Sequence, residues 1–228
     1  MSPLIISKFE YFVLKNLTLS YNVLSISKDL TILAFLHKYC VSIPLPVPIS
    51  QTFSKDLISD NSIIFFVTLK SIKNYLGDSA LEIGAGSGIV SDFLSRNFKN
   101  VVATDIDFKS LLYCKANTNS KINLICCDAT KAIYGKFDLI VSNPPYLPND
   151  PFYDKTIHGG ITGIEKTIHF IESGITNLKK NGYIILIVSS LSDTLKFDEC
   201  ICKKKLNKKI INKAKIFFET LYVYELVL

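Results

Sequence analysis

Three glycines in this chain have the spacing of a turn that receives a ligand. The segment Leu81-Glu82-Ile83-Gly84-Ala85-Gly86-Ser87-Gly88 has the form of a buried strand that runs into a glycine-rich turn and a helix. Glycine has no side chain, so the backbone at Gly84, Gly86 and Gly88 can turn sharply and approach a ligand closely. The Gly-x-Gly-x-Gly spacing differs from the Gly-x-Gly-x-x-Gly fingerprint of dinucleotide sites, which disfavours NAD. Taken alone, the motif also fits a tight turn without a ligand.

Acidic residues stand beside this turn and after the next two predicted strands. Glu82 is unusual at a buried strand end, so we expect it to accept a hydrogen bond from the backbone or from a cofactor. Asp105 can accept both hydroxyls of a ribose; the alternative is that Asp105 or Asp107 caps a helix. Asp128 can accept from an adenine amino group; the alternative is a simple turn aspartate. Ligands bind at the carboxyl edge of parallel sheets, so the coincidence of these residues with the glycines predicts an adenosine-type ligand.

The segment Asn143-Pro144-Pro145-Tyr146, called the clamp from here on, supplies hydrogen-bond acceptors after another apolar strand. Prolines remove donors and fix the backbone, which leaves the Pro144 carbonyl and the Asn143 amide oxygen to accept from one substrate amino group. Two acceptors would hold both hydrogens and aim the nitrogen lone pair at a sulfonium methyl group, with the reacting atoms ~3 to 3.5 Å apart. Tyr146 can stack on a planar amide or base. A rigid Pro-Pro turn without chemistry is the alternative.

Alternating strands and helices must position these residues. Nearly continuous runs of Ile, Val and Leu predict buried strands, and segments with helical spacing separate them. The predicted strands are Ser79–Ile83, Val101–Thr104, Ile122–Cys126, Phe137–Ser142 and Gly182–Ser189, followed by a strand pair within Lys209–Leu228 that turns around Glu219. The predicted helices are Ser62–Tyr75, Ile89–Asn97, Ser110–Thr118 and Ile164–Leu178. This alternation predicts an α/β fold, with a parallel sheet covered by helices on both faces.

Length and composition indicate one α/β domain with an appendage. The 228 residues are 48% hydrophobic and 20% charged, which is typical of a packed globular core. Residues 1–54 are predicted as an N-terminal extension that ends in the proline-rich connector Ile43-Pro44-Leu45-Pro46-Val47-Pro48. Residues 55–228 are predicted as the ligand-binding domain.

Charge and cysteine spacing disfavour other classes of protein. The net charge of +6 is modest and fits a solvated basic face better than a nucleic-acid surface. None of the six cysteines has the C-x-x-C spacing of zinc ligands, so no metal site is predicted. Charged residues interrupt the N-terminal apolar stretches, which fall short of the ~20 apolar residues of a membrane span, and no secretion signal is recognised. We therefore expect a protein of the reducing cytoplasm without a membrane segment.

The glycine turn and the clamp together resemble those of the HemK-related protein-glutamine methyltransferases, particularly the archaeal and eukaryotic release-factor branch. The segments Gly159-Gly160-Ile161-Thr162-Gly163-Ile164-Glu165 and Phe217-Phe218-Glu219-Thr220-Leu221-Tyr222-Val223 are also similar to that branch. The likeness covers about Asp56 to Leu228. Ser59-Asp60-Asn61-Ser62 resembles a looser form of the branch's acidic entry motif, from which the usual tyrosine and proline are absent.

This resemblance implies a seven-stranded, Rossmann-like class I methyltransferase with an antiparallel C-terminal strand and S-adenosyl-L-methionine as cofactor. The implied target is the side-chain amide of glutamine in the Gly-Gly-Gln loop of a class I peptide chain release factor. A small zinc-ribbon activator protein is the implied partner and would cover apolar surface. The residues implied at the cofactor are Glu82, Gly84, Gly86, Gly88, Asp105, Asp128 and Asn143. Those implied at the substrate are Asn143, Pro144, Pro145 and Tyr146, of which Asn143, Pro144 and Tyr146 are the catalytic candidates.

Two other functions fit parts of the pattern. An N6-adenine or other nucleic-acid amino methyltransferase could hold a flipped base in the same clamp. It would need a target-recognition region, for which the chain offers only about its first 55 residues and its lysine clusters. A non-catalytic scaffold is disfavoured by the intact glycines and the intact Asn143. The sequence positions of His158 and His169 are more typical of structural histidines than of catalytic ones. The clusters Lys203-Lys204-Lys205 and Lys208-Lys209 are typical of a solvated helix end.

Overall fold

The computed structural model describes residues 60–118, 121–151, 154–216 and 219–228. The chain divides into two compact units. The larger unit comprises Val67–Lys215 and Glu219–Leu228 and contains every predicted cofactor and substrate residue. The smaller unit comprises Met1–Phe66 and Ile216–Phe218. The predicted N-terminal extension, residues 1–54, lies outside the described residues.

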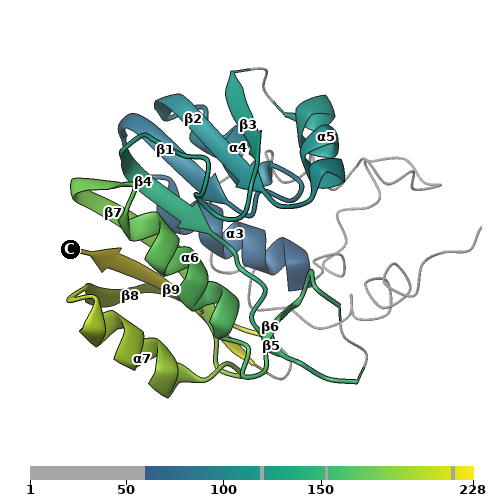
Figure 1. The fold of residues 1–228 in the computed structure, drawn as a ribbon, viewed down its shortest axis with the longest axis vertical. Helices are drawn as coiled ribbons and strands as arrows, with labels where there is room; N and C mark the ends of the chain where they lie inside the picture. The colour runs from purple at the N-terminus through teal and green to yellow at the C-terminus, as the bar shows by residue number, and fades with distance from the viewer. Residues whose placement is uncertain (1–59, 119–120, 152–153, 217–218) are drawn as a thin grey trace, which may run out of the picture. The chain divides into compact units, whose positions relative to one another are not determined.

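A seven-stranded sheet with the order β3-β2-β1-β4-β7-β9-β8 spans the larger unit (Figure 1). Strands β3, β2, β1, β4 and β7 pair in parallel, whereas β9 runs antiparallel to both of its neighbours. The predicted α/β fold with an antiparallel C-terminal strand pair is therefore confirmed. The bounds are β1 Gly77–Ile83, β2 Phe98–Asp105, β3 Ile122–Cys126, β4 Phe137–Ser142, β7 Leu178–Ser189, β8 Asn207–Lys215 and β9 Thr220–Val227.

Strand β7 is longer than predicted because it contains an irregularity. The strand predicted at Gly182–Ser189 begins earlier, where Leu178 pairs with Phe137 before the register shifts. Asn181 has a φ of 71° at this point, a conformation that asparagine tolerates better than most residues. The helix predicted at Ile164–Leu178 is correspondingly shorter.

Helices cover both faces of the sheet, as the alternation of side chains along β1 shows. Leu81 and Ile83 belong to a buried cluster with residues of α6 and α7, whereas Glu82 between them bonds Ser91 of α4. The helices are α3 Asp60–Ile72, α4 Ile89–Leu94, α5 Phe108–Asn117, α6 Glu165–Ile175 and α7 Thr194–Lys203. In the described ranges, none of them has the length and apolarity that crossing a bilayer requires.

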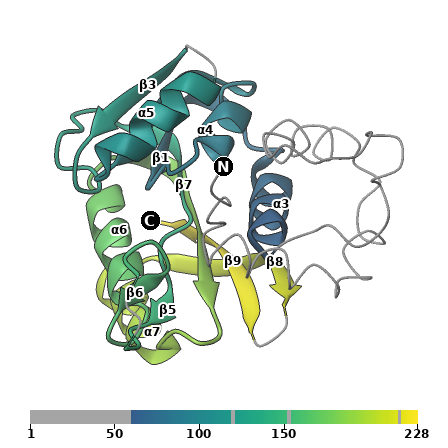
Figure 2. The ribbon, with the colours of Figure 1, turned by 90° about the vertical axis from the view of Figure 1, so that its right-hand side faces the viewer.

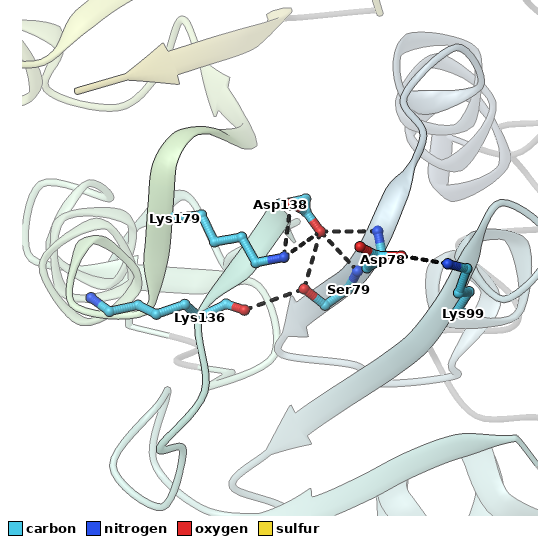
Figure 3. Close-up of polar contacts among 6 residues, drawn as sticks. All are labelled: Asp78, Ser79, Lys99, Lys136, Asp138 and Lys179. Atoms are coloured by element: carbon cyan, nitrogen blue, oxygen red, sulfur yellow. Dashed lines mark hydrogen bonds and ion pairs between the residues drawn. The ribbon is translucent and has the colours of Figure 1, made fainter.

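A polar cluster joins the amino ends of β1 and β4 (Figure 3). Asp138 Oδ2 accepts hydrogen bonds from Ser79 N at 2.9 Å and from Asp78 N at 3.0 Å. Lys179 Nζ lies 2.8 Å from the same oxygen, and Lys99 Nζ lies 2.7 Å from Asp78 Oδ1. Since this edge is opposite the carboxyl ends of the parallel strands, the cluster fixes the sheet at a distance from the predicted site.

A short two-stranded parallel sheet follows the clamp. It consists of β5 Leu147–Pro148 and β6 His158–Gly160 and was not predicted from the sequence. Both views show it beside α6 (Figures 1 and 2). The segment that follows the clamp is thereby packed near the helices on one face of the main sheet.

Candidate cofactor and amide site

The carboxyl edge of four neighbouring parallel strands brings the predicted site residues together. Strands β3, β2, β1 and β4 are adjacent in the sheet. Ile83 pairs with Thr104 and with Ser142, and Asp105 pairs with Cys126. The residues at or just after these positions are the glycine turn, Asp105, Asp128 and Asn143. The structure thus places all of them at one edge, where ligands of such sheets bind.

The glycine turn is left-handed at each glycine, with φ of 78° at Gly84, 49° at Gly86 and 79° at Gly88. A Cβ atom on Gly88 would overlap with Cys114 Sγ of α5, whereas a Cβ atom on Gly86 would meet no atom within 4 Å. The adjacent hydroxyl of Ser87 is buried and has no hydrogen-bond partner among the described residues. The turn therefore offers open space and an unused polar atom at Gly86 and Ser87.

Asp105 receives backbone hydrogen bonds on both carboxylate oxygens. Gly86 N donates to Oδ2 at 2.9 Å, and Asp107 N donates to Oδ1 at 2.8 Å. Asp107 is the N-cap of α5, where its side chain accepts from Ser110 N. A carboxylate has about four lone-pair positions, so Asp105 retains acceptor capacity for a ligand. The helix-cap alternative applies to Asp107 and not to Asp105.

Glu82 is buried under the glycine turn, with 4% of its surface exposed. Its Oε2 accepts from Ser91 N at 2.8 Å and also from Ser91 Oγ. Burial raises the pKa of Glu82 to about 8, although the hydrogen bonds from Ser91 act in the opposite direction. The expected hydrogen bond to the backbone is present, and it joins the strand before the turn to the helix after it.

Asp128 lies between a lysine and a histidine. Lys131 Nζ is 2.6 Å from Oδ2, and His169 Nε2 is 2.8 Å from Oδ1. The hydrogen bond from Lys131, and then that from His169, lowers the pKa of the Asp128 carboxyl. His169 comes from α6, and sequence reasoning gave it no role. Because the two residues are 41 positions apart, only the fold reveals this pair.

The clamp begins where β4 ends. Ser142 Oγ donates to Ile83 O at 2.8 Å, which fixes the end of β4 against β1. Asn143 Oδ1 is buried and has no hydrogen-bond partner among the described residues. Such atoms are uncommon, since an unsatisfied buried polar group costs about 1–3 kcal/mol. Asn143 Oδ1 is thus available to accept a hydrogen bond from a ligand.

Backbone contacts support the clamp from two sides. Tyr146 N donates to Ile157 O at 3.1 Å, and Ser192 Oγ donates to Tyr146 O at 2.8 Å. Cβ atoms on Gly159 and Gly163 would overlap with carbonyl oxygens of the clamp. The Gly-Gly-x-x-Gly segment therefore lies against the clamp backbone, which only glycine permits at these positions.

His158 is buried in β6, next to this support. Its ring is 3% exposed, and its Nδ1 lies 2.8 Å from Asp154 N, which donates to it. Its Nε2 lies 3.5 Å from Asp150 Oδ1. These contacts tie the residues after the clamp to β6, so His158 has structural contacts of the kind predicted for it.

Comparisons with known proteins agree with this geometry. Residues 49–217 match the model of the methyltransferase small domain family. A Methanocaldococcus jannaschii protein named as a protein N5-glutamine methyltransferase is 32% identical, over 72% of this chain and 87% of its own. The release factor glutamine methyltransferase of Flavobacterium psychrophilum is 28% identical, over 53% of this chain and 41% of its own. The E. cuniculi Mtq2-Trm112 complex, described as methylating the eRF1 translation termination factor, shares the fold. Its TM-score is 0.60 at 22% identity, over 71% of this chain and 93% of that chain.

The seven-stranded sheet with a glycine turn at its carboxyl edge, together with the match to the methyltransferase small domain family, identifies a class I methyltransferase. S-adenosyl-L-methionine is the methyl donor of this class. The open turn at Gly86 and the hydroxyl of Ser87, which has no hydrogen-bond partner among the described residues, fit that cofactor. The chain belongs to the methyltransferase small domain family and, within it, to the HemK-related protein-glutamine N5-methyltransferases.

Proposed function

We propose that this protein methylates the side-chain amide nitrogen of glutamine in the Gly-Gly-Gln loop of a class I peptide chain release factor. The buried, unpartnered Asn143 Oδ1 carries the proposal, because it requires a donor that the described residues do not supply. A primary amide is such a donor, and it is planar. The names of the Methanocaldococcus and Flavobacterium relatives support glutamine and a release factor as the target.

The cofactor would be held by the carboxyl edge of β1, β2 and β3. Asp105 keeps acceptor capacity for the ribose hydroxyls, and Asp128 for the adenine amino group. The open backbone at Gly86 would receive the polar amino-acid end of the cofactor, whereas Gly84 and Gly88 shape the turn. Glu82 would position the turn rather than contact the cofactor, because its hydrogen bonds join the strand before the turn to α4. When bound, S-adenosyl-L-methionine supplies an electrophilic methyl group.

The clamp would orient the amide rather than activate it with a base. Asn143 Oδ1 and the Pro144 carbonyl each accept one hydrogen of the amide, so the nitrogen is aligned with the methyl group. Tyr146 would stack on the amide plane beside Pro145, and the buried Pro144 together with the buried Asn143 Oδ1 would limit the access of water. No residue of the clamp removes the proton before transfer, and the proton leaves to solvent afterwards.

A small zinc-ribbon activator protein would be the partner of this methyltransferase. Phe108 and Leu112 lie one turn apart on α5 and are 60% and 53% exposed, and Tyr113 is 50% exposed. Exposed apolar side chains gathered on one helix are typical of a protein interface. Co-expression with a candidate activator should yield a complex that Phe108→Ser with Leu112→Ser weakens. An unchanged yield of complex would contradict this placement.

Methyl transfer from labelled S-adenosyl-L-methionine to a cognate release factor tests the proposed function. We expect label on the wild-type factor and none on a variant factor in which alanine replaces the loop glutamine. Each reaction is run with and without the activator. Asn143→Ala should abolish labelling while cofactor binding persists, whereas the control Asn149→Ala, at an exposed position after the clamp, should not. Intact cofactor binding with no label on either factor would contradict glutamine as the target and favour a nucleic-acid amino group.

A further inference from the structure

Four exposed apolar side chains lie on the segments next to the clamp. Ile157 is 37% exposed, Ile161 80%, Leu191 46% and Leu195 76%. Ile157 precedes β6, Ile161 lies in the Gly-Gly-x-x-Gly segment, Leu191 follows β7, and Leu195 lies in the first turn of α7. We call these four residues the apolar rim.

Hydrogen bonds connect the loops of the apolar rim with the clamp. Ile157 O accepts from Tyr146 N at 3.1 Å. Ser192, next to Leu191, donates through its hydroxyl to Tyr146 O at 2.8 Å. Asp193 N in turn donates to Thr162 O at 3.0 Å, which joins the loop of Leu191 to that of Ile161. The apolar rim is therefore continuous with the clamp through the backbone.

Hydrogen bonds order the segments that carry Ile161 and Leu195. Asp193 Oδ1 caps α7 by accepting from Leu195 N and Lys196 N, each at 3.1 Å. Glu165 accepts from Thr162 N through both carboxylate oxygens, at 3.1 and 3.2 Å. A surface that is already ordered loses little conformational entropy when a partner binds.

The charged side chains among these loops are partly engaged with one another. Lys196 Nζ lies 3.9 Å from both Glu165 Oε1 and Asp193 Oδ2. A phosphate group would therefore compete with two carboxylates for this lysine, which disfavours nucleic acid as the occupant. The apolar rim is therefore suited to an occupant with apolar side chains.

We propose that the apolar rim docks apolar side chains of the protein segment that carries the acceptor amide. This inference rests on the proposed function and adds to it the surface that distinguishes a folded release factor from a short glutamine peptide. A clamp for one amide group recognises few atoms, so the selection of a protein needs further contacts. The segments that carry the apolar rim are hydrogen-bonded to the clamp, so residues that flank the glutamine would meet the apolar rim first.

The test uses the double variant Ile161→Glu with Leu195→Glu and the matched control Leu76→Glu. Leu76 is 76% exposed, as is Leu195, but it precedes β1 at the opposite edge of the sheet. Glutamate is compatible with the first turn of α7, because the amino end of a helix favours a negative charge. Calorimetry gives the Kd for the release factor and for the cofactor. Steady-state kinetics give KM and kcat for the factor and for a Gly-Gly-Gln peptide.

We expect the double variant to raise both Kd and KM for the factor about tenfold, as loss of a central apolar contact does. Its kcat, its Kd for the cofactor and its kinetics with the peptide should stay as in the wild type. A Kd for the factor equal to that of Leu76→Glu would overturn the proposal. So would an altered oligomeric state with unchanged factor binding, which would assign the apolar rim to contacts between copies of this chain. Factor binding that depends on the apolar rim, without any methyl transfer to glutamine, would refute the proposed function and leave the docking surface standing.

Discussion

The buried carboxyl of Glu82 makes a prediction about stability and pH. Burial raises the pKa of Glu82 from 4.5 to about 8 in the folded protein. Between these two values the unfolded chain carries an ionised Glu82, whereas the folded chain keeps it protonated. Unfolding then releases a proton, so the free energy of unfolding falls as pH rises through this range. The contribution is fully present below about pH 4.5 and is lost by about pH 8.

The magnitude follows from the same two values. Each tenfold change in proton affinity corresponds to about 1.4 kcal/mol, so the full loss is at most about 5 kcal/mol. The Glu82→Gln variant keeps a neutral side chain of the same shape at every pH, with an oxygen that can still accept from Ser91. The variant should therefore lack this decline. The other titrating groups are shared by both proteins, so their contributions cancel to first order in the comparison.

Urea unfolding of both proteins at several pH values between about 5 and 8 measures the difference. The free energy of unfolding of Glu82→Gln, relative to wild type, should rise steadily with pH and gain several kcal/mol by about pH 8. Parallel pH profiles for the two proteins would refute the argument, because they would mean that Glu82 titrates alike in the folded and unfolded chains.

Three further substitutions test the packing around the site. Gly88→Ala places a Cβ atom against Cys114 at a φ of 79°, so it should lower the free energy of unfolding by about 1–3 kcal/mol in urea titrations. Gly159→Ala places a Cβ atom against the Pro145 carbonyl of the clamp, so kcat on the release factor should fall at least about tenfold while calorimetry finds cofactor binding unchanged. Ser192→Ala removes the hydrogen bond to Tyr146 O, worth about 1 kcal/mol, and should raise KM for the factor several-fold with little change in kcat. If a variant gives the wild-type value in its assay, the role assigned to that contact is contradicted.

The sequence predicts the sheet and the edge that carries the site, because both depend on local pattern. The strands at Ile122–Cys126 and Phe137–Ser142 have the predicted bounds, since each is a short apolar run. Glycines and acidic residues after successive strands must meet at one edge when the strands are parallel and adjacent. The placement of Asp105 and Asn143 therefore follows from strand order alone.

The parts that sequence reasoning missed depend on contacts distant in the chain or on a weaker signal. The pair of Asp128 with His169 exists only because α6 packs near the end of β3. The helix Thr194–Lys203 had a visible signal: an N-cap at Asp193 and buried residues at helical spacing, Phe197, Cys200 and Ile201. The sequence analysis placed a solvated helix end at Lys203-Lys204-Lys205, where α7 does end, but it did not assign the helix itself. For Lys208-Lys209 that prediction was wrong, because both residues lie in β8. That Asn143 Oδ1 has no hydrogen-bond partner within the described part of the chain is a property of its tertiary surroundings and has no counterpart in sequence spacing.

Tandem mass spectrometry of the release factor after reaction tests the central claim most directly. The factor is incubated with this protein, its activator candidate and S-adenosyl-L-methionine, then digested and sequenced, beside a reaction with the Asn143→Ala enzyme. The account predicts one added methyl group on the side-chain nitrogen of the glutamine in the Gly-Gly-Gln loop, absent with the variant. A methyl group on any other residue, or an equal yield from Asn143→Ala, would contradict the account.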